Sequence, residues 1–91
     1  MNIYDDITLI IVTYRSENLI VKNLNILKKF KVIIIDNSNS DKLDKIINEF
    51  NNIKLIRSKK NLGYGKAINL GVSKSDTFFI LMVSPDVLLT V

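Results

Sequence analysis

The sequence predicts an α/β fold built on a parallel four-stranded sheet, and three observations support this prediction. Four short apolar runs recur along the 91 residues, at 7–12, 32–35, 53–56 and 78–83. Segments with helical features separate these runs, which gives the order βαβαβαβ. The runs are almost continuously apolar, as strands are in a parallel sheet that helices cover on both faces. We therefore expect one domain, folded as a three-layer sandwich.

The segment after the first run predicts a helix. Ser16 is a suitable N-cap and Glu17 falls in the first turn, where a negative charge favours the helix dipole. The apolar face of this helix consists of Leu19, Ile20, Leu24 and Leu27.

The second helix has the clearest periodicity, with Ser40 or Asp41 as its cap. Its apolar residues fall at i, i+3, i+4 and i+7, and they are Leu43, Ile46, Ile47 and Phe50. The third segment begins with a turn that contains Gly63 and becomes helical around Lys66. Its small residues, which include Gly71, allow close packing on the sheet.

The run 78–83 is expected to be a buried strand that stops at Pro85, because proline cannot donate to a sheet ladder. Right-handed crossovers around a central first strand favour the strand order 3-2-1-4. This order creates a switch point between the first and fourth strands, where ligands collect beyond the carboxyl ends. The residues expected to line this crevice are Thr13, Tyr14, Asp36, Asn37, Ser84 and Asp86.

Composition limits the chemistry that these residues can perform. The chain has neither Cys nor His, which excludes thiolate nucleophiles, Cys/His zinc sites and a histidine base. Its net charge is +4, but the basic residues alternate with acidic ones and form no basic stripe, so we expect no nucleic-acid partner. Asp5 and Asp6 stand where a secretory signal would be basic, and no run approaches membrane-helix length. We expect a cytoplasmic protein, free or peripheral at the cytoplasmic face of a membrane.

Each candidate residue has a second interpretation. Asp86 could bind a divalent cation that bridges a diphosphate, or it could be a solvated turn residue. Asp36 and Asn37 could accept the imide N–H of uracil or thymine, or simply form a turn. Tyr14 with Thr13 could contact a base, although such a tyrosine often only packs.

Lys66 could bind phosphate, or it could be an ordinary surface residue. The glycines of the third segment are no dinucleotide fingerprint, because that motif follows the first strand and has a third glycine.

Taken together, these motifs resemble the amino-terminal half of a family 2 glycosyltransferase with the GT-A fold. The matching stretches are IIVTY at 10–14, VIIIDNS at 32–38, NLGYGKAINLG at 61–71 and SPDV at 84–87. The last is similar to the Asn-Pro-Asp-Val metal motif of rhamnosyltransferase-like members. Ser84 stands where Asp or Asn often opens that motif, and Asn37 replaces a common second acidic residue.

The resemblance implies an inverting, metal-dependent transferase that acts on a UDP- or dTDP-sugar. Asp86 would coordinate Mg²⁺ or Mn²⁺ on the diphosphate, and Ser84 would lie beside it in the donor site. Thr13, Tyr14 and the pair Asp36 and Asn37 would hold the base and ribose. The acceptor would be a cell-envelope polysaccharide, another glycan or a lipid-linked glycan.

The family's acceptor-binding half and catalytic base lie downstream of the matched stretches, so the resemblance implies that residues 1–91 form a partial donor-binding domain of a longer chain. We expect such a piece to be inactive by itself. It would expose apolar surface and an open strand edge, which invites self-association. The alternative is a non-catalytic nucleotide-binding or self-associating α/β module.

Overall fold

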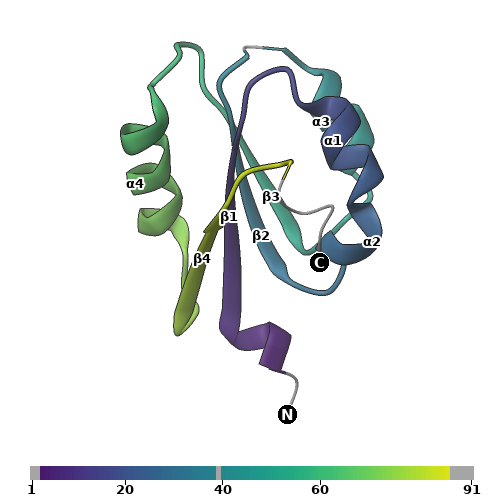
Figure 1. The fold of residues 1–91 in the computed structure, drawn as a ribbon, viewed down its shortest axis with the longest axis vertical. Coiled ribbons are helices and arrows are strands. Elements are labelled where there is room, and N and C mark those ends of the chain that lie inside the picture. The colour runs from purple at the N-terminus through teal and green to yellow at the C-terminus, as the bar shows by residue number, and fades with distance from the viewer. Residues whose placement is uncertain (1–2, 39, 87–91) are drawn as a thin grey trace.

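A computed structural model describes residues 3–38 and 40–86, which form an α/β sandwich (Figure 1). A short 3-10 helix, η1, precedes the first strand. The elements in chain order are η1 (Ile3–Asp6), β1 (Ile7–Thr13), α1 (Glu17–Lys22), α2 (Leu24–Leu27), β2 (Lys31–Asp36), α3 (Lys42–Ile47), β3 (Ile53–Arg57), α4 (Tyr64–Lys74) and β4 (Phe79–Val83).

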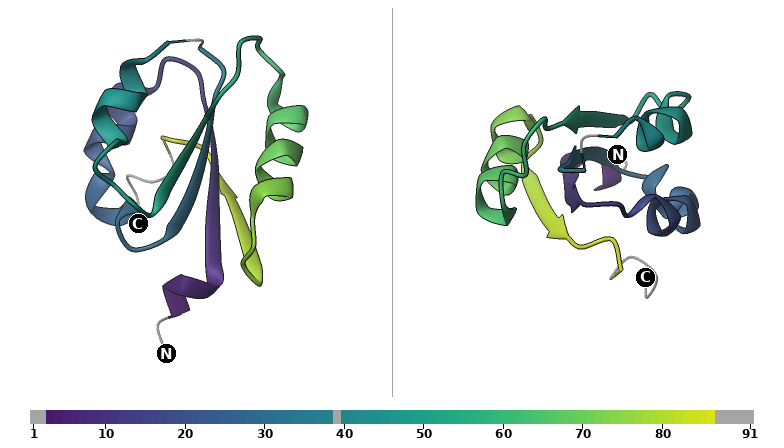
Figure 2. Two further views of the ribbon diagram at one scale, coloured as in Figure 1. Left: turned by 180° about the vertical axis from the view of Figure 1, so that it is seen from behind. Right: turned by 90° about the horizontal axis from the view of Figure 1, so that it is seen from above.

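The four strands form one sheet in the order β3-β2-β1-β4, and every neighbouring pair is parallel. This confirms the predicted fold class and strand order. Helices α1, α2 and α3 lie on one face of the sheet and α4 lies on the other (Figure 2). The carboxyl ends of β1 and β2 are in register, with Thr13 opposite Asp36.

Alternating side chains of the strands divide the core in two. On one face, Leu9 and Ile11 of β1 join the buried residues of α1, α2 and α3. On the other face, Ile10 and its neighbours on β2 pack against Ala67 and Ile68 of α4. Both faces of β1 and β2 are therefore buried, as their continuous apolar sequences predict.

Gly71 sets the distance between α4 and the sheet. A Cβ atom at this position would lie 2.7 Å from Cγ2 of Ile10 and 2.9 Å from Cδ1 of Ile35. Both distances are shorter than an ordinary carbon–carbon contact. The glycine therefore allows α4 to pack closely against β1 and β2, as the sequence predicts.

The predicted first helix is wrong in one respect, because it is two short helices that meet at Asn23. The buried side chain of Asn23 donates a 2.7 Å hydrogen bond to the carbonyl of Leu19, and its backbone N–H bonds to the carbonyl of Ile20. These local bonds compete with a continuous helical pattern. Ser16 is at the N-cap as predicted, but its side chain makes no capping bond.

Two other helix boundaries differ from the prediction by a few residues. Helix α4 begins at Tyr64, two residues before Lys66. Helix α3 ends at Ile47, so Phe50 follows the helix but still packs against the predicted core.

Strand β4 was expected to be buried, and this expectation is wrong. The strand exists and pairs with β1, but none of the described helices covers it, and its side chains from Phe79 to Met82 are exposed. The preceding Phe78 is 86% exposed. The helices cover β1 and β2 instead, so β4 forms an uncovered edge (Figure 2). Strand β4 therefore presents apolar side chains at an edge of the sheet.

Within the described part of the chain, no helix is both long enough and apolar enough to cross a membrane.

Candidate functional site

Two buried polar residues lie side by side at the carboxyl edge of the sheet. Thr13 ends β1 and Asp36 ends β2, and each is only 1% exposed. The Thr13 hydroxyl donates a 2.9 Å hydrogen bond to Oδ1 of Asp36. Because a buried carboxylate needs hydrogen-bond donors, this contact fixes the orientation of Asp36.

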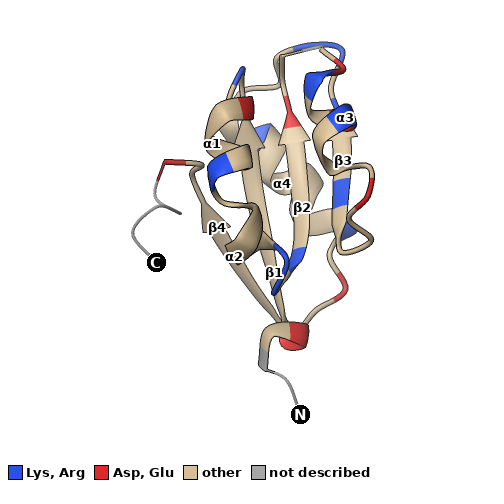
Figure 3. Ribbon diagram, turned by 90° about the vertical axis from the view of Figure 1, so that its right-hand side faces the viewer, with Lys and Arg blue, Asp and Glu red and all other residues tan. Residues whose placement is uncertain are grey.

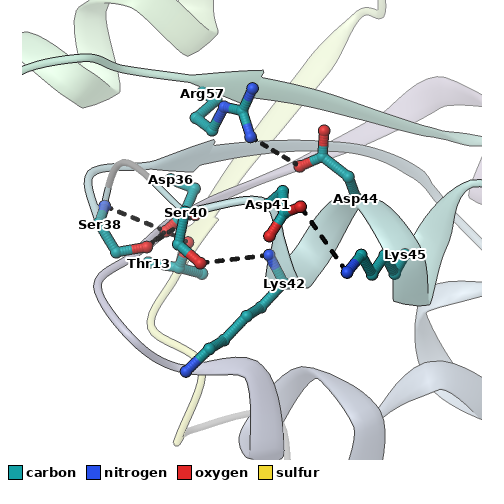
Figure 4. Close-up of polar contacts among 9 residues, drawn as sticks. All are labelled: Thr13, Asp36, Ser38, Ser40, Asp41, Lys42, Asp44, Lys45 and Arg57. Atoms are coloured by element: carbon teal, nitrogen blue, oxygen red, sulfur yellow. Dashed lines mark hydrogen bonds and ion pairs between the residues drawn. The ribbon is translucent and has the colours of Figure 1, made fainter.

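Ser38 supplies the other donors to this carboxylate. Its hydroxyl lies 2.8 Å from both carboxylate oxygens of Asp36, and its backbone N–H lies 3.4 Å from Oδ1 (Figure 4). Among residues 3–38 and 40–86, Oδ1 therefore has three donors, whereas Oδ2 has only the shared Ser38 hydroxyl. Oδ2 retains the capacity to accept a hydrogen bond from a ligand.

Asn37 links three segments of this edge. Its backbone N–H donates to the Thr13 carbonyl at 2.9 Å, and its Oδ1 accepts from the Leu62 N–H at 3.4 Å. The side chain is almost fully buried. Part of its accepting capacity thus holds the loop before α4, a role that the sequence did not reveal.

Tyr14 and Arg15 form the turn after β1, and both are exposed. The guanidinium carbon of Arg15 lies 5.3 Å from the centre of the Tyr14 ring. Arg15 has a φ of 53°, which a residue with a side chain rarely adopts. Ser16 stabilises the turn, since its hydroxyl donates to the Tyr14 carbonyl at 3.2 Å and accepts from the Tyr14 N–H at 3.4 Å.

Lys66 lies in the first turn of α4 and is exposed. The turn before it depends on Gly63, whose φ of 77° favours glycine. The Asn61 side chain supports the same turn by accepting from the Gly63 N–H at 2.9 Å. Within the described part of the chain, Lys66 forms no hydrogen bond or ion pair with Thr13 or Asp36.

Ser84 and Asp86 follow β4 at a distance from this pair along the sheet. The pairing of β4 with β1 ends at Val83 opposite Ile11, before the level of Thr13. The chain then bends toward the side of the sheet that carries α1 and α2 (Figures 1 and 2). Ser84 is half-buried and Asp86 is exposed. Val87, the last residue of the SPDV motif, lies outside the described residues.

The structure therefore brings together some predicted site residues and not others. Thr13, Asp36 and Asn37 form one hydrogen-bonded group, and Tyr14 adjoins it in sequence. Asp86 makes no contact with this group among the described residues. Ser38 is the main residue that the sequence analysis underestimated, and its position two residues after Asp36 is the signal for such a local bond.

A comparison with protein-family models matches residues 8–90 to "Glycosyl transferase family 2". The chain belongs to this family. The matched range contains every predicted site residue, and membership indicates glycosyl transfer from a nucleotide-sugar donor to an acceptor. A search of curated proteins found no match for this glycosyltransferase domain.

Carboxylates are the metal ligands that this glycosyltransferase domain offers, since it has neither Cys nor His. Among residues 3–38 and 40–86, no three acidic side chains gather into a cluster. Asp36 is buried and largely occupied by hydrogen bonds, so it is a poor ligand. Asp86 is an exposed carboxylate. One such ligand suits Mg²⁺ or Mn²⁺ when phosphate oxygens and water complete the coordination, so the residues present fit a metal held jointly with a diphosphate.

Proposed function

We propose that this chain is the donor-binding part of an inverting, metal-dependent glycosyltransferase. The donor would be a UDP- or dTDP-sugar, and the acceptor a cell-envelope polysaccharide or another glycan, free or lipid-linked. The observation that supports this best is the hydrogen bond from Thr13 to Asp36. It holds a buried carboxylate at the carboxyl edge of a parallel sheet, where such folds bind ligands.

In this proposal Asp36 recognises the base. Its Oδ2 would accept the imide N–H of uracil or thymine, while Thr13 and Ser38 hold the carboxylate in place through Oδ1. Tyr14, which is exposed beside this pair, would stack on the base. Asn37 would hold this edge of the sheet in shape through its bonds to β1 and to the loop before α4.

The charged residues of the proposed site would act on the diphosphate. Asp86 would hold Mg²⁺ or Mn²⁺ together with the phosphate oxygens, and Ser84 would lie beside it. When bound, the metal supplies charge stabilisation for the departing nucleoside diphosphate. Lys66, exposed at the start of α4, would contact a phosphate oxygen as a compact positive charge.

The SPDV motif supports a rhamnosyltransferase-like member, with either a UDP- or a dTDP-sugar as donor. We further propose that residues 1–91 bind only the sugar donor, and that other residues bind the acceptor and supply the catalytic base. The cytoplasmic setting expected from the sequence stays a prediction.

Calorimetric titration of UDP and dTDP, with and without Mn²⁺, tests this proposal. We expect nucleotide binding that strengthens with Mn²⁺, and loss of the metal effect in Asp86→Asn. The matched control is Glu49→Gln, which also removes one exposed negative charge but lies outside the site. Circular dichroism would verify that each variant is folded. Absence of nucleotide binding by the folded chain, or an equal effect of both variants, would contradict the proposal.

One observation supports the alternative of a self-associating module. No strand in the described part of the chain pairs with the outer edge of β4, which leaves backbone N–H and C=O groups open there. Residues Phe79–Val83 include no charged side chain that would block edge pairing. The occupant that we propose for this edge is a second copy of the chain. Two copies related by a twofold axis would place their β4 strands antiparallel, which satisfies both edges at once.

A further inference from the structure

A second polar site lies at the opposite end of the sheet from Thr13 and Asp36. A cavity of about 530 Å³ opens at the amino ends of the strands. Five lysines line it, and they come from three separate parts of the chain: Lys28, Lys29 and Lys31 between α2 and the start of β2, Lys54 in β3 and Lys74 at the end of α4. The connection from α2 into β2 is blue in Figure 3, at the lower end of the sheet.

This cavity carries most of the net charge of the chain. Its charged lining residues are the five lysines together with Asp5 and Asp76, which gives 5 − 2 = +3. The whole chain has 13 basic and 9 acidic residues, a net charge of +4. The basic residues look evenly distributed in the sequence, but the fold gathers the positive excess around one concave site. A positive potential focused in a cleft attracts anions.

Three of the lysines are available for a ligand. Lys31 forms an ion pair with Asp76 at 3.8 Å, and Lys28 lies 5.7 Å from the centre of the Phe50 ring. For Lys29, Lys54 and Lys74, which are exposed, no ion pair is found within the described part of the chain.

Hydroxyl groups form part of the same lining. Thr8 is buried at the cavity, and its hydroxyl shares a 2.5 Å hydrogen bond with the Thr77 hydroxyl. The Ser75 hydroxyl, which also lines the cavity, lies 3.5 Å from Thr77. Buried Val32 and Ile33 add an apolar portion. The volume is in the range of small-molecule sites, which typically combine apolar walls with a few polar groups.

We propose that this cavity binds a small, multiply charged phosphate compound. Lysines suit phosphate because each ammonium is a compact charge with three donors, and the hydroxyl of Ser75 adds a neutral donor. A soluble ligand fits better than an anionic membrane, because the site is a concave cavity rather than a flat surface. The inference does not depend on the proposed transferase function, since the two sites lie at opposite ends of the strands.

An NMR titration with tripolyphosphate tests the site, monitored through backbone amide shifts at physiological ionic strength. We expect saturable shifts for Thr8, Lys29 and Ser75, and none for Thr13 or Asn37. The double variant Lys54→Gln with Lys74→Gln should weaken binding roughly tenfold, because it removes two charge-assisted contacts.

The matched control is Lys22→Gln with Lys45→Gln, which removes the same charge from exposed helix positions outside the cavity. This control should bind tripolyphosphate like the unmodified chain. Equal weakening in both double variants would overturn the proposal, because binding would then depend only on net charge. Shifts confined to the carboxyl edge would also overturn it. A further experiment measures binding to phosphatidylcholine vesicles that contain phosphatidic acid. Binding to these vesicles without saturable binding of tripolyphosphate would also overturn the proposal.

Discussion

The hydroxyl of Thr13 lies 2.9 Å from the carboxylate of Asp36, and both side chains are almost completely buried at the end of the sheet. The two residues are 23 positions apart in sequence but directly opposite each other on β1 and β2. A pair buried in this way contributes to the stability of the fold as well as to any ligand site. Its contribution to stability can be measured by unfolding, without a ligand.

We predict that Thr13→Val destabilises the chain by about 1–3 kcal/mol, because Asp36 Oδ1 loses a buried donor while the side-chain volume hardly changes. Thr13→Ser should be less destabilising, since it keeps the hydroxyl. Urea denaturation measures both free energies of unfolding. If hydrophobic burial were the main role of Thr13, the order would be reversed and valine would be the milder substitution.

Gly71 and Gly65 provide a second comparison, because both lie in α4 but in different surroundings. Gly71→Ala should lower the free energy of unfolding by about 1–2 kcal/mol, since the new methyl group overlaps Ile10 and Ile35. A Cβ atom added at Gly65 meets no atom within 4 Å, so Gly65→Ala should raise the free energy of unfolding by up to about 1 kcal/mol through helix propensity. Thermal or urea unfolding of the two variants is the test, and stabilisation by both would show that α4 can move away from the sheet.

The exposed edge strand predicts concentration-dependent association. Leu81 in β4 is 50% exposed and Val21 in α1 is 48% exposed, so they are matched in exposure but differ in location. If β4 pairs with a second copy, Leu81→Thr should weaken the dimer about tenfold by removing apolar contact area, and Val21→Thr should leave it unchanged. Analytical ultracentrifugation over a range of concentrations measures this. A chain that stays monomeric throughout would refute edge pairing.

The strand order was predictable because the apolar runs and helical segments can be read from short stretches of sequence, and because few arrangements satisfy the topological rules. Four apolar runs, three intervening segments with helical features and right-handed crossovers leave little choice around a central β1. Thr13 and Asp36 were predictable as neighbours for the same reason, since each ends a strand at the same edge. The family match is consistent with this local information.

The features that the sequence did not predict depend on contacts rather than on pattern. The break at Asn23 depends on a side-chain bond to Leu19, and the same residue type would also be tolerated on an exposed helix face. The exposure of β4 depends on which helices cover which strands, and its apolar sequence is the same whether it is covered or not. The positive φ of Arg15 likewise arises from the path of the turn, since arginine itself does not favour it.

The pairing of β4 with β1 also affects the order of events during synthesis. Thr8 of β1 and its partner Thr77, just before β4, are 69 positions apart, whereas β2 follows β1 after only two short helices. As the chain leaves the ribosome, β1 can pair with β2 early, but its other edge must wait until nearly the whole described chain has emerged. During that interval the open edge of β1 is accessible to other chains. Slow translation or chaperone binding over this period would therefore influence how much of the protein reaches its native sheet.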